Sequence, residues 1–254
     1  MKNLASLRAL LIASIVACSA LAKATEPTKS ITLSTVEDAV LQQISIEVLK
    51  QAYREIDYKV IVLRFPNERS LLTADAGHVD GEVSRIWDIH SVYKNLIPIP
   101  SPINQVDVVA FSKGKPVLNI GQLSQSKLSC ARGVKIVEAL AKDNNLNCYF
   151  SSGFAQALRM LDRNRVDFAL LPQINGYAMI KDKQLINIQQ ASKALASEPL
   201  FHYLHKKRAD LVAPLDQAIQ TMQHSGRIEA IRKNILLSIS MHNRPEPSTT
   251  EQNN

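Results

Sequence analysis

Few residues of this 254-residue sequence stand at spacings that support chemistry. Asp80 and Glu82 lie two positions apart, which on a β-strand puts both carboxylates on one face, the arrangement of a paired acid/base site. A turn-facing Asp80 and an edge Glu82 beside Gly81 are the alternative interpretation. His202 and His205 lie three positions apart, on opposite faces of a strand, and so predict no shared metal. No constellation here requires an enzyme.

The glycines exclude two nucleotide-binding loops. The chain has eight, no two of them within three residues of each other, and no pair has the spacing of a dinucleotide loop or a phosphate loop. The sequence also lacks a GxSxG elbow, an HExxH helix and an EF-hand loop. We therefore predict a binding protein rather than an enzyme, with no metal and no cofactor.

Composition sets the broad class of the protein. The chain is 46% hydrophobic, 21% charged and 5% aromatic, which excludes a disordered chain, a collagen-like fibre and a disulfide-dense miniprotein. Its length allows one large or two modest domains. The formal charge is +7, but the basic residues are scattered, and the longest basic run, Lys206 to Arg208, has no aromatic-studded basic strip beside it. We therefore expect no nucleic-acid partner.

The N-terminus predicts export. Lys2 and Arg8 precede the uncharged run Ala9 to Ala22, which at fourteen residues is too short to span a membrane and typical of a signal peptide. Residues 1–24 are the predicted signal peptide, with cleavage after Ala24 or, alternatively, after Ala22. Cleavage after Ala24 leaves 27 Lys and Arg against 23 Asp and Glu, a formal charge of +4. A buried N-terminal helix is the alternative.

Cys18 offers a second processing route. Residues 15–18 (IVAC) resemble a lipobox, in which Cys18 becomes lipidated and anchors the chain to a membrane. Either route places the protein in the periplasm. Cys130 and Cys148 remain in the mature chain, where an oxidising compartment allows a disulfide. Because both fall in strands expected to lie in one parallel sheet, we favour two buried thiols.

Helices and strands alternate along the mature chain, a pattern typical of sheets covered by helices on both faces. Residues 113–116 (KGKP) interrupt the pattern and suggest a crossing between two lobes, while the polar residues 243–254 suggest a disordered tail. We predict lobe 1 from 25–112 plus 191–242 and lobe 2 from 113–190. The expected helices are 36–56, 66–76, 134–143, 155–164, 175–182, 211–224 and 228–235, and the expected strands are 58–63, 79–83, 106–111, 127–131, 148–150, 166–171, 185–188 and 199–204.

Three segments carry a family resemblance. Residues 66–71 (PNERSL), 77–82 (GHVDGE) and 164–168 (NRVDF) resemble the repeated R-x-L…G-x-(I/V)-D-(G/A) elements of the bacterial extracellular solute-binding proteins, family 3. The similarity extends over roughly residues 31–235. It implies an α/β, two-lobed periplasmic-binding-protein type II fold, with mixed, mostly parallel sheets and a hinge between the lobes. Ligands of such sheets bind at the carboxyl ends of the strands.

The resemblance also implies positions for ligand contacts. Arg85 ends a first-lobe strand where the family has cleft-facing polar residues, and its guanidinium suits a carboxylate, although it could instead pair with Glu82 or Asp88. Arg132 follows a second-lobe strand at a helix start, where amides favour anions. The further candidates are Arg69, Glu37 and Gln173.

Two departures from the family bear on the ligand. The family's Asp for the ligand's amino group corresponds here to Pro172, followed by Gln173, and its Thr-x-x-Arg stretch has no match near Trp87 and Asp88. An anionic or aromatic molecule is therefore as suitable as an α-amino acid. Trp87 and Tyr177 could stack on such a ligand or pack within their own lobes.

These observations predict a monomeric periplasmic protein that captures a small polar or anionic ligand, amino-acid-like or carboxylate, in an interlobe cleft. The resemblance implies an ABC-type inner-membrane permease as its partner. The alternatives are a ligand-binding component of a membrane sensor, or a lyase or dehydratase on the same scaffold.

Overall fold

The computed structural model describes residues 29–37, 39–117 and 119–241. The predicted signal peptide, Cys18 and the predicted tail 243–254 lie outside these residues. Within them, no helix is long and apolar enough to cross a membrane. Helices and strands alternate as predicted, in the order β1 Lys29–Val36, α2 Val40–Arg54, β2 Tyr58–Phe65, α3 Asn67–Asp75, β3 Gly81–Arg85, η1 Trp87–Ser91, β4 Leu96–Pro98, β5 Asn104–Ser112, η2 Ile120–Leu123, β6 Leu128–Ala131, α4 Lys135–Asp143, β7 Cys148–Ser151, α5 Phe154–Asp162, β8 Phe168–Pro172, α6 Gln173–Asp182, β9 Gln189–Gln190, β10 Ala196–His205, η3 Lys206–Leu211, α7 Val212–His224 and α8 Arg227–Met241.

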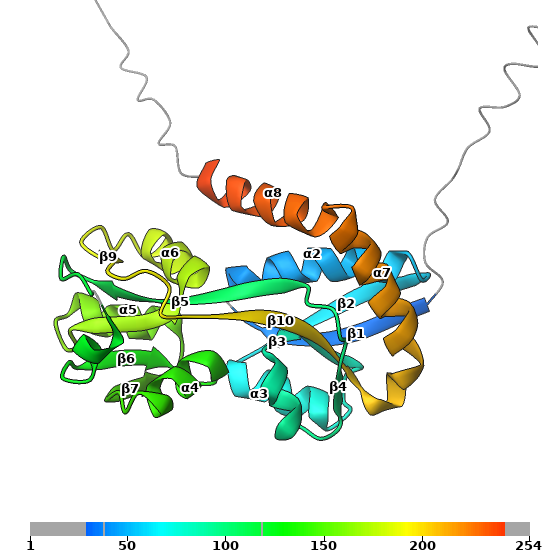
Figure 1. Ribbon diagram of the computed structural model, residues 1–254, viewed down its shortest axis with the longest axis horizontal. Helices are drawn as coiled ribbons and strands as arrows, with labels where there is room; N and C mark the ends of the chain where they lie inside the picture. Colours follow the sequence, from blue (N-terminus) through cyan, green and yellow to red (C-terminus); the bar gives the residue numbers. More distant parts are fainter. Residues whose placement is uncertain (1–28, 38, 118, 242–254) are drawn as a thin grey trace, which may run out of the picture.

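The strands form two lobes that share one long strand (Figure 1). In lobe 1, β2, β1 and β3 are parallel, and the second half of β10 pairs antiparallel with β3 and β4. In lobe 2, β8, β6 and β7 are parallel, while β5 pairs antiparallel with β8, β9 and the first half of β10. This mixed, two-lobed α/β arrangement confirms the predicted fold class.

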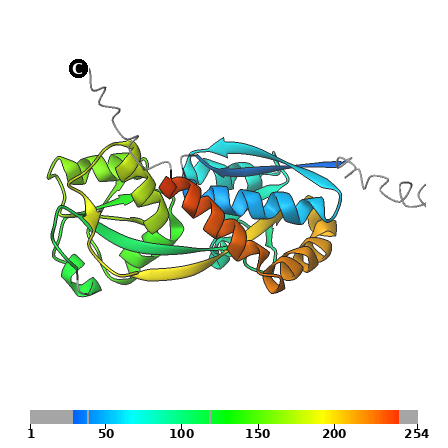
Figure 2. The same cartoon turned by 90° about the horizontal axis from the view of Figure 1, so that it is seen from above.

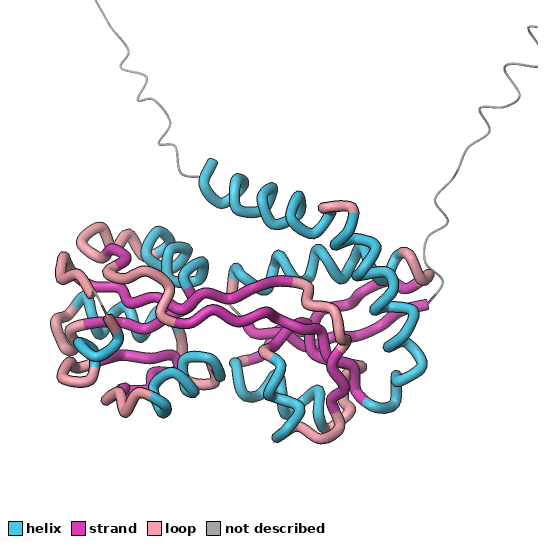
Figure 3. Tube along the Cα trace, viewed as in Figure 1, coloured by secondary structure: helices cyan, strands magenta, loops and turns pink. Residues whose placement is uncertain are grey.

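The strand pairing bears on where the chain crosses between the lobes, although the predicted lobe boundaries stay a prediction. Residues 104–108 of β5 already pair with β10, and residues 108–111 pair with β8, so the chain enters lobe 2 before β5 rather than at residues 113–116. β5 and β10 run side by side across the middle of the molecule (Figure 3). The pairing therefore favours lobe boundaries near residues 103/104 and 200/201, rather than the predicted 112/113 and 190/191. A β-strand's partner is not a local property of sequence, so residue spacing alone does not assign β5 to a lobe.

Apolar side chains fill each lobe and also join the two lobes. One cluster in lobe 1 gathers β1, α2, α7 and α8, including Ile31, Leu49 and Ile219. Two further clusters bring Leu41 and Ile44, or Val36 and Ala39, from the first lobe against side chains of lobe 2. α8 lies along α2 and extends toward the second lobe (Figures 1 and 2). The lobes therefore meet across a partly apolar interface.

Cys130 and Cys148 form a disulfide, so the preference for two buried thiols was wrong. In the parallel β6–β7 pair, Cys130 lies opposite Phe150, and Cys148 is two residues before Phe150, so both cysteines lie on one face of the sheet as diagonal neighbours. Their Cα atoms are 5.7 Å apart, within the range that a disulfide requires. The bond ties β7 to its neighbour in the sheet, β6.

Replacing both cysteines tests the contribution of this bond. Closing a loop of this length restricts the unfolded chain, so Cys130→Ser with Cys148→Ser should lower the free energy of unfolding by about 3 kcal/mol. Chemical denaturation of the oxidised protein and the double variant would measure the difference. An identical midpoint and slope for the two proteins would contradict a disulfide in the folded protein.

A buried histidine supports the strand that ends at Arg85. His202 of β10 is fully buried, and its Nδ1 lies 2.9 Å from the carbonyl oxygen of Glu82 and 3.2 Å from that of Val83. Because carbonyls only accept, Nδ1 carries the proton and donates, and Nε2 accepts from the hydroxyl of Tyr53 at 2.8 Å. Burial lowers the pKa of His202 to about 4.

This shift predicts a loss of stability in acid. The neutral ring stabilises the folded state fully above the pKa of an unfolded histidine, about 6.5, and that contribution falls as the pH drops toward about 4, by roughly 3 kcal/mol in total. Denaturation midpoints between pH 7.5 and 4.5 would measure it. The variant His202→Gln should show a shallower decline, and an equally steep one would assign the effect to other groups.

Candidate functional site

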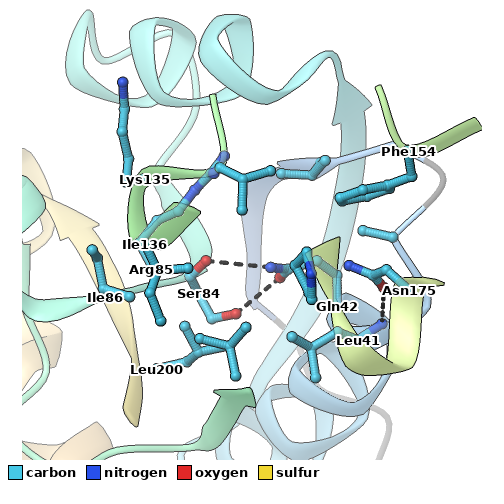
Figure 4. Close-up of a pocket in the computed structure, with 15 residues that line it drawn as sticks. Leu41, Gln42, Ser84, Arg85, Ile86, Lys135, Ile136, Phe154, Asn175 and Leu200 are labelled. Atoms are coloured by element: carbon cyan, nitrogen blue, oxygen red, sulfur yellow. Dashed lines mark hydrogen bonds between the residues drawn. The ribbon is translucent and has the colours of Figure 1, made fainter. Parts of the chain in front are cut away.

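A small cavity lies between the lobes at the carboxyl ends of β1, β3 and β8 (Figure 4). Its volume is about 60 Å³. Side chains of both lobes contribute to the wall, and most of them are apolar. The lining residues are Val36, Ala39, Leu41, Gln42, Ser84, Arg85 and Ile86 from lobe 1 and Val106, Val134, Lys135, Ile136, Phe154, Pro172, Asn175 and Leu200 from lobe 2.

Arg85, predicted as a ligand contact, lines this cavity at the end of β3. Its Nε donates to Oε1 of Glu82 at 2.8 Å, and Glu82 is completely buried. The other oxygen of Glu82 accepts from the hydroxyls of Ser34 and Ser70, each at 2.6 Å. The alternative pairing with Glu82 is therefore present, but in the interior rather than on the surface. Three donors compensate the burial of this carboxylate and fix the base of the Arg85 side chain.

The neutral polar groups of the wall hydrogen-bond with the protein itself. Oε1 of Gln42 accepts from Oγ of Ser84 at 2.9 Å and from Oγ1 of Thr35 at 3.3 Å. Oδ1 of Asn175, on α6 of lobe 2, accepts from the backbone N–H of Leu41 at 2.9 Å (Figure 4). Because Leu41 lies in the first turn of α2, Asn175 caps a lobe 1 helix from the opposite lobe.

Lys135, at the start of α4, points away from the other lining residues in Figure 4. Its Nζ lies 2.9 Å from Oε2 of Glu68 and 3.1 Å from Oε2 of Glu138. Partial burial opposes the charge of Lys135, but the hydrogen bonds to both carboxylates raise its pKa overall. Burial likewise opposes the charge of Glu68, and the hydrogen bonds from Tyr93 and Lys135 lower its pKa. Since Glu68 is on α3, this ion pair joins the two lobes.

The other predicted site residues lie outside this cavity. Arg69 and Arg132 are exposed on α3 and just after β6. Gln173 begins α6, and its Nε2 donates to Oε1 of Gln190 at 2.9 Å, while its neighbours Pro172 and Asn175 line the cavity. Glu37 lines an adjoining chamber of about 210 Å³, which shares the lining residues Val36 and Phe154 with the cavity. As ligand contacts, all of these residues stay predictions.

The remaining candidates have structural partners. Oδ2 of Asp80 accepts from the backbone N–H of Thr32 at 2.9 Å, and the Asp80 carboxylate pairs with Lys207 and Arg208. Since Glu82 is buried against Arg85, the two carboxylates form no acid/base pair. Among the described residues, no cluster of three His, Cys, Asp or Glu could hold a metal.

The two aromatic candidates pack within their own lobes. Trp87 lies edge-on to Phe201, with ring centroids 4.8 Å apart. Tyr177 lies edge-on to Phe111, and its hydroxyl donates to Oε1 of Gln190. Neither ring lines the cavity or the adjoining chamber.

Sequence reasoning missed Gln42, Ser84, Lys135 and Asn175 as lining residues. Ser84 directly precedes Arg85, and Lys135 stands at the start of a predicted helix after the second-lobe strand, so both had a usable positional signal. Gln42 and Asn175 had none, because each reaches the cavity only through the packing of its helix.

The strand order, the shared strand and the interlobe cavity define the two-lobed periplasmic-binding-protein fold. A histidine kinase sensor domain with similarity to periplasmic binding proteins aligns with a TM-score of 0.72 at 18% identity, over 83% of this chain and 97% of that one. The amino acid ABC transporter substrate-binding protein AbpA of Streptococcus pneumoniae, bound to L-arginine, aligns with a TM-score of 0.69 at 15% identity, over 83% and 95%. The GluR0 ligand-binding core in complex with L-glutamate aligns with a TM-score of 0.71 at 11% identity, over 82% of this chain and 99% of that one.

Comparison of sequences gives fewer matches than comparison of structures. The sequence matches no family model. An uncharacterized protein of Shewanella oneidensis is 23% identical over 205 residues, which cover 77% of this chain and 76% of that protein. The structural neighbours establish the fold, and they include an amino acid substrate-binding protein, of the type that the resemblance implied, and a sensor domain, of the type considered as an alternative.

The interlobe ion pair predicts a shift between closed and open forms. Glu68→Gln removes the contact with Lys135 and should lower the ratio of closed to open protein by up to about fivefold, the most that a partly exposed ion pair usually contributes. Distances between spin labels on the two lobes would measure this ratio at low salt without ligand. Glu55→Gln is the matched control, because Glu55 pairs with Arg227 within lobe 1 at 2.7 Å. Equal distance distributions for both variants would contradict a role in closure.

Proposed function

We propose that this protein is a periplasmic solute-binding protein that captures a small polar or anionic ligand between its lobes. The observation that carries the proposal is the interlobe cavity, which both lobes line and to which Arg85 contributes a guanidinium. A ligand held by both lobes favours the closed form over the open form by its differential affinity for the two. The predicted signal peptide supports export. The alternative processing route is lipidation at Cys18, which would anchor the protein to a membrane.

The partner that we propose is an ABC-type inner-membrane transporter, to which a monomeric protein presents its ligand. Similarity to the S. pneumoniae substrate-binding protein supports this role. The second candidate is a sensor, and the observation that favours it is the similarity to a histidine kinase sensor domain. Loss of uptake of the bound ligand on gene deletion would support transport, whereas intact uptake with a lost transcriptional response would support sensing.

A catalytic role has no comparable support. Asp80 and Glu82, the carboxylates considered for a lyase or dehydratase, hydrogen-bond with structural partners. The neighbours described above are binding and sensor proteins. We therefore propose that the bound ligand is released unchanged.

A double variant tests the binding site. Arg85→Met alone would leave the Glu82 carboxylate buried without its cation, at a cost of several kcal/mol, so Glu82→Gln is combined with it to keep the interior neutral. Loss of the charge-assisted hydrogen bonds should weaken ligand binding about 10- to 150-fold. The change in melting temperature should be much smaller than that caused by Arg85→Met alone.

The measurement is isothermal titration calorimetry of the mature protein, after a thermal-shift screen of L-arginine, L-glutamate, benzoate, 4-methyl-2-oxopentanoate, putrescine and dialanine. Arg163→Gln is the control, because Arg163 is an exposed arginine outside both cavities. An unchanged dissociation constant in the double variant would remove Arg85 from the site. If no compound in the screen stabilises the protein or changes the interlobe distance, the proposed function is wrong.

A further inference from the structure

The interlobe cavity offers few acceptors to a positively charged group. Among the described lining residues there is no aspartate or glutamate. The two side-chain amide oxygens of the wall already accept hydrogen bonds, that of Gln42 from Ser84 and Thr35, and that of Asn175 from the backbone of Leu41. The hydroxyl of Ser84 also bonds Oγ of Ser45 at 3.0 Å.

An ammonium group would therefore be poorly accommodated here. It carries three N–H donors, and burying them without acceptors costs free energy. A ligand with no charged group at that position avoids this cost. The α-ammonium of an amino acid lies two bonds from its carboxylate carbon. A carboxylate held at Arg85 thus keeps the ammonium inside this cavity and away from Glu37, which lines the adjoining chamber.

The wall suits a ligand with a negatively charged group and an apolar body. Arg85 and Lys135 are its charged lining residues in the described part of the chain, and the ammonium of Lys135 is directed to Glu68 and Glu138. Arg85 is also paired, since its Nε donates to Glu82 at 2.8 Å, but its side chain lines the cavity, and its guanidinium is the cationic group that we place against the ligand. The apolar lining consists of Val36, Ala39, Leu41, Ile86, Val106, Val134, Ile136, Phe154, Pro172 and Leu200.

We infer that the ligand is a small monocarboxylate with an apolar aliphatic or aromatic body and no ammonium group. This inference rests on the proposed function and specifies the ligand class of the same site. The carboxylate contacts the guanidinium of Arg85, and the body packs between the ends of β1 and β3 on one lobe and the starts of α4 and α5 on the other. The adjoining chamber shares Val36 and Phe154 with this cavity as lining residues.

Matched ligand series test this class. L-leucine, 4-methyl-2-oxopentanoate and 4-methylpentanoate share one apolar body, as do L-phenylalanine and 3-phenylpropanoate, and the members of each series differ at the α-carbon. 4-Methylpentanamide keeps the body and removes the negative charge. Titration calorimetry on the mature protein should give the ammonium-free acids at least tenfold tighter binding than the matching amino acids, and tighter binding than the amide.

The double variant Arg85→Met with Glu82→Gln should abolish the preference for the acid over the amide, while Arg163→Gln keeps it. Tighter binding of the amino acids than of the ammonium-free acids would overturn the inference and leave the proposed function intact. Equal binding of acid and amide by the unmodified protein would also overturn it. If neither series binds, and the broader screen also fails, the proposed function falls together with this inference.

Discussion

The architecture of the site depends on one compensated charge in the interior. Glu82 is completely buried, and a carboxylate there is stable only because Ser34, Ser70 and Arg85 donate to it. These donors come from three elements, β1, α3 and β3, so the same contacts that satisfy the charge also fix how lobe 1 is assembled. The cation needed for this balance, Arg85, also lines the interlobe cavity. Under the proposed function, stability and ligand recognition share this pair of residues, and neither residue can be replaced alone without affecting both.

The closed arrangement of the lobes has support from the protein itself. Asn175 caps α2 across the interface, Lys135 reaches Glu68, and apolar residues of α2 pack against lobe 2. Within lobe 2, Gly176 lets α6 pack closely on β5, because a Cβ at that position would lie 2.3 Å from the ring of Phe111, and this packing positions the neighbouring Asn175. Under the proposed function, a ligand adds to contacts that already join the lobes, and it shifts the equilibrium between the open and closed forms only by the difference in its affinity for the two.

Local sequence signals predicted the elements well and their partners less well. The apolar stripe of α2 and the buried run of β2 follow from residue spacing, and the position of Arg85 at a cavity followed from its place at the end of a strand. The pairing of β5, the disulfide and the role of Asn175 each depend on contacts between residues far apart in the chain. Cys130 and Cys148 illustrate the difference, since strand membership was predicted but the diagonal register that joins them was not.

The unbroken course of β10 has a mechanical consequence. Residues 196–200 pair with β5, and residues 201 and 203–205 pair with β3 and β4, with a register irregularity between 201 and 203 but no loop between the two sets. Relative movement of the lobes must then be absorbed as torsion within a hydrogen-bonded ribbon, because no slack segment separates them on this strand. Such a ribbon resists large rotations of one lobe relative to the other, which suits a protein whose lobes move through small angles.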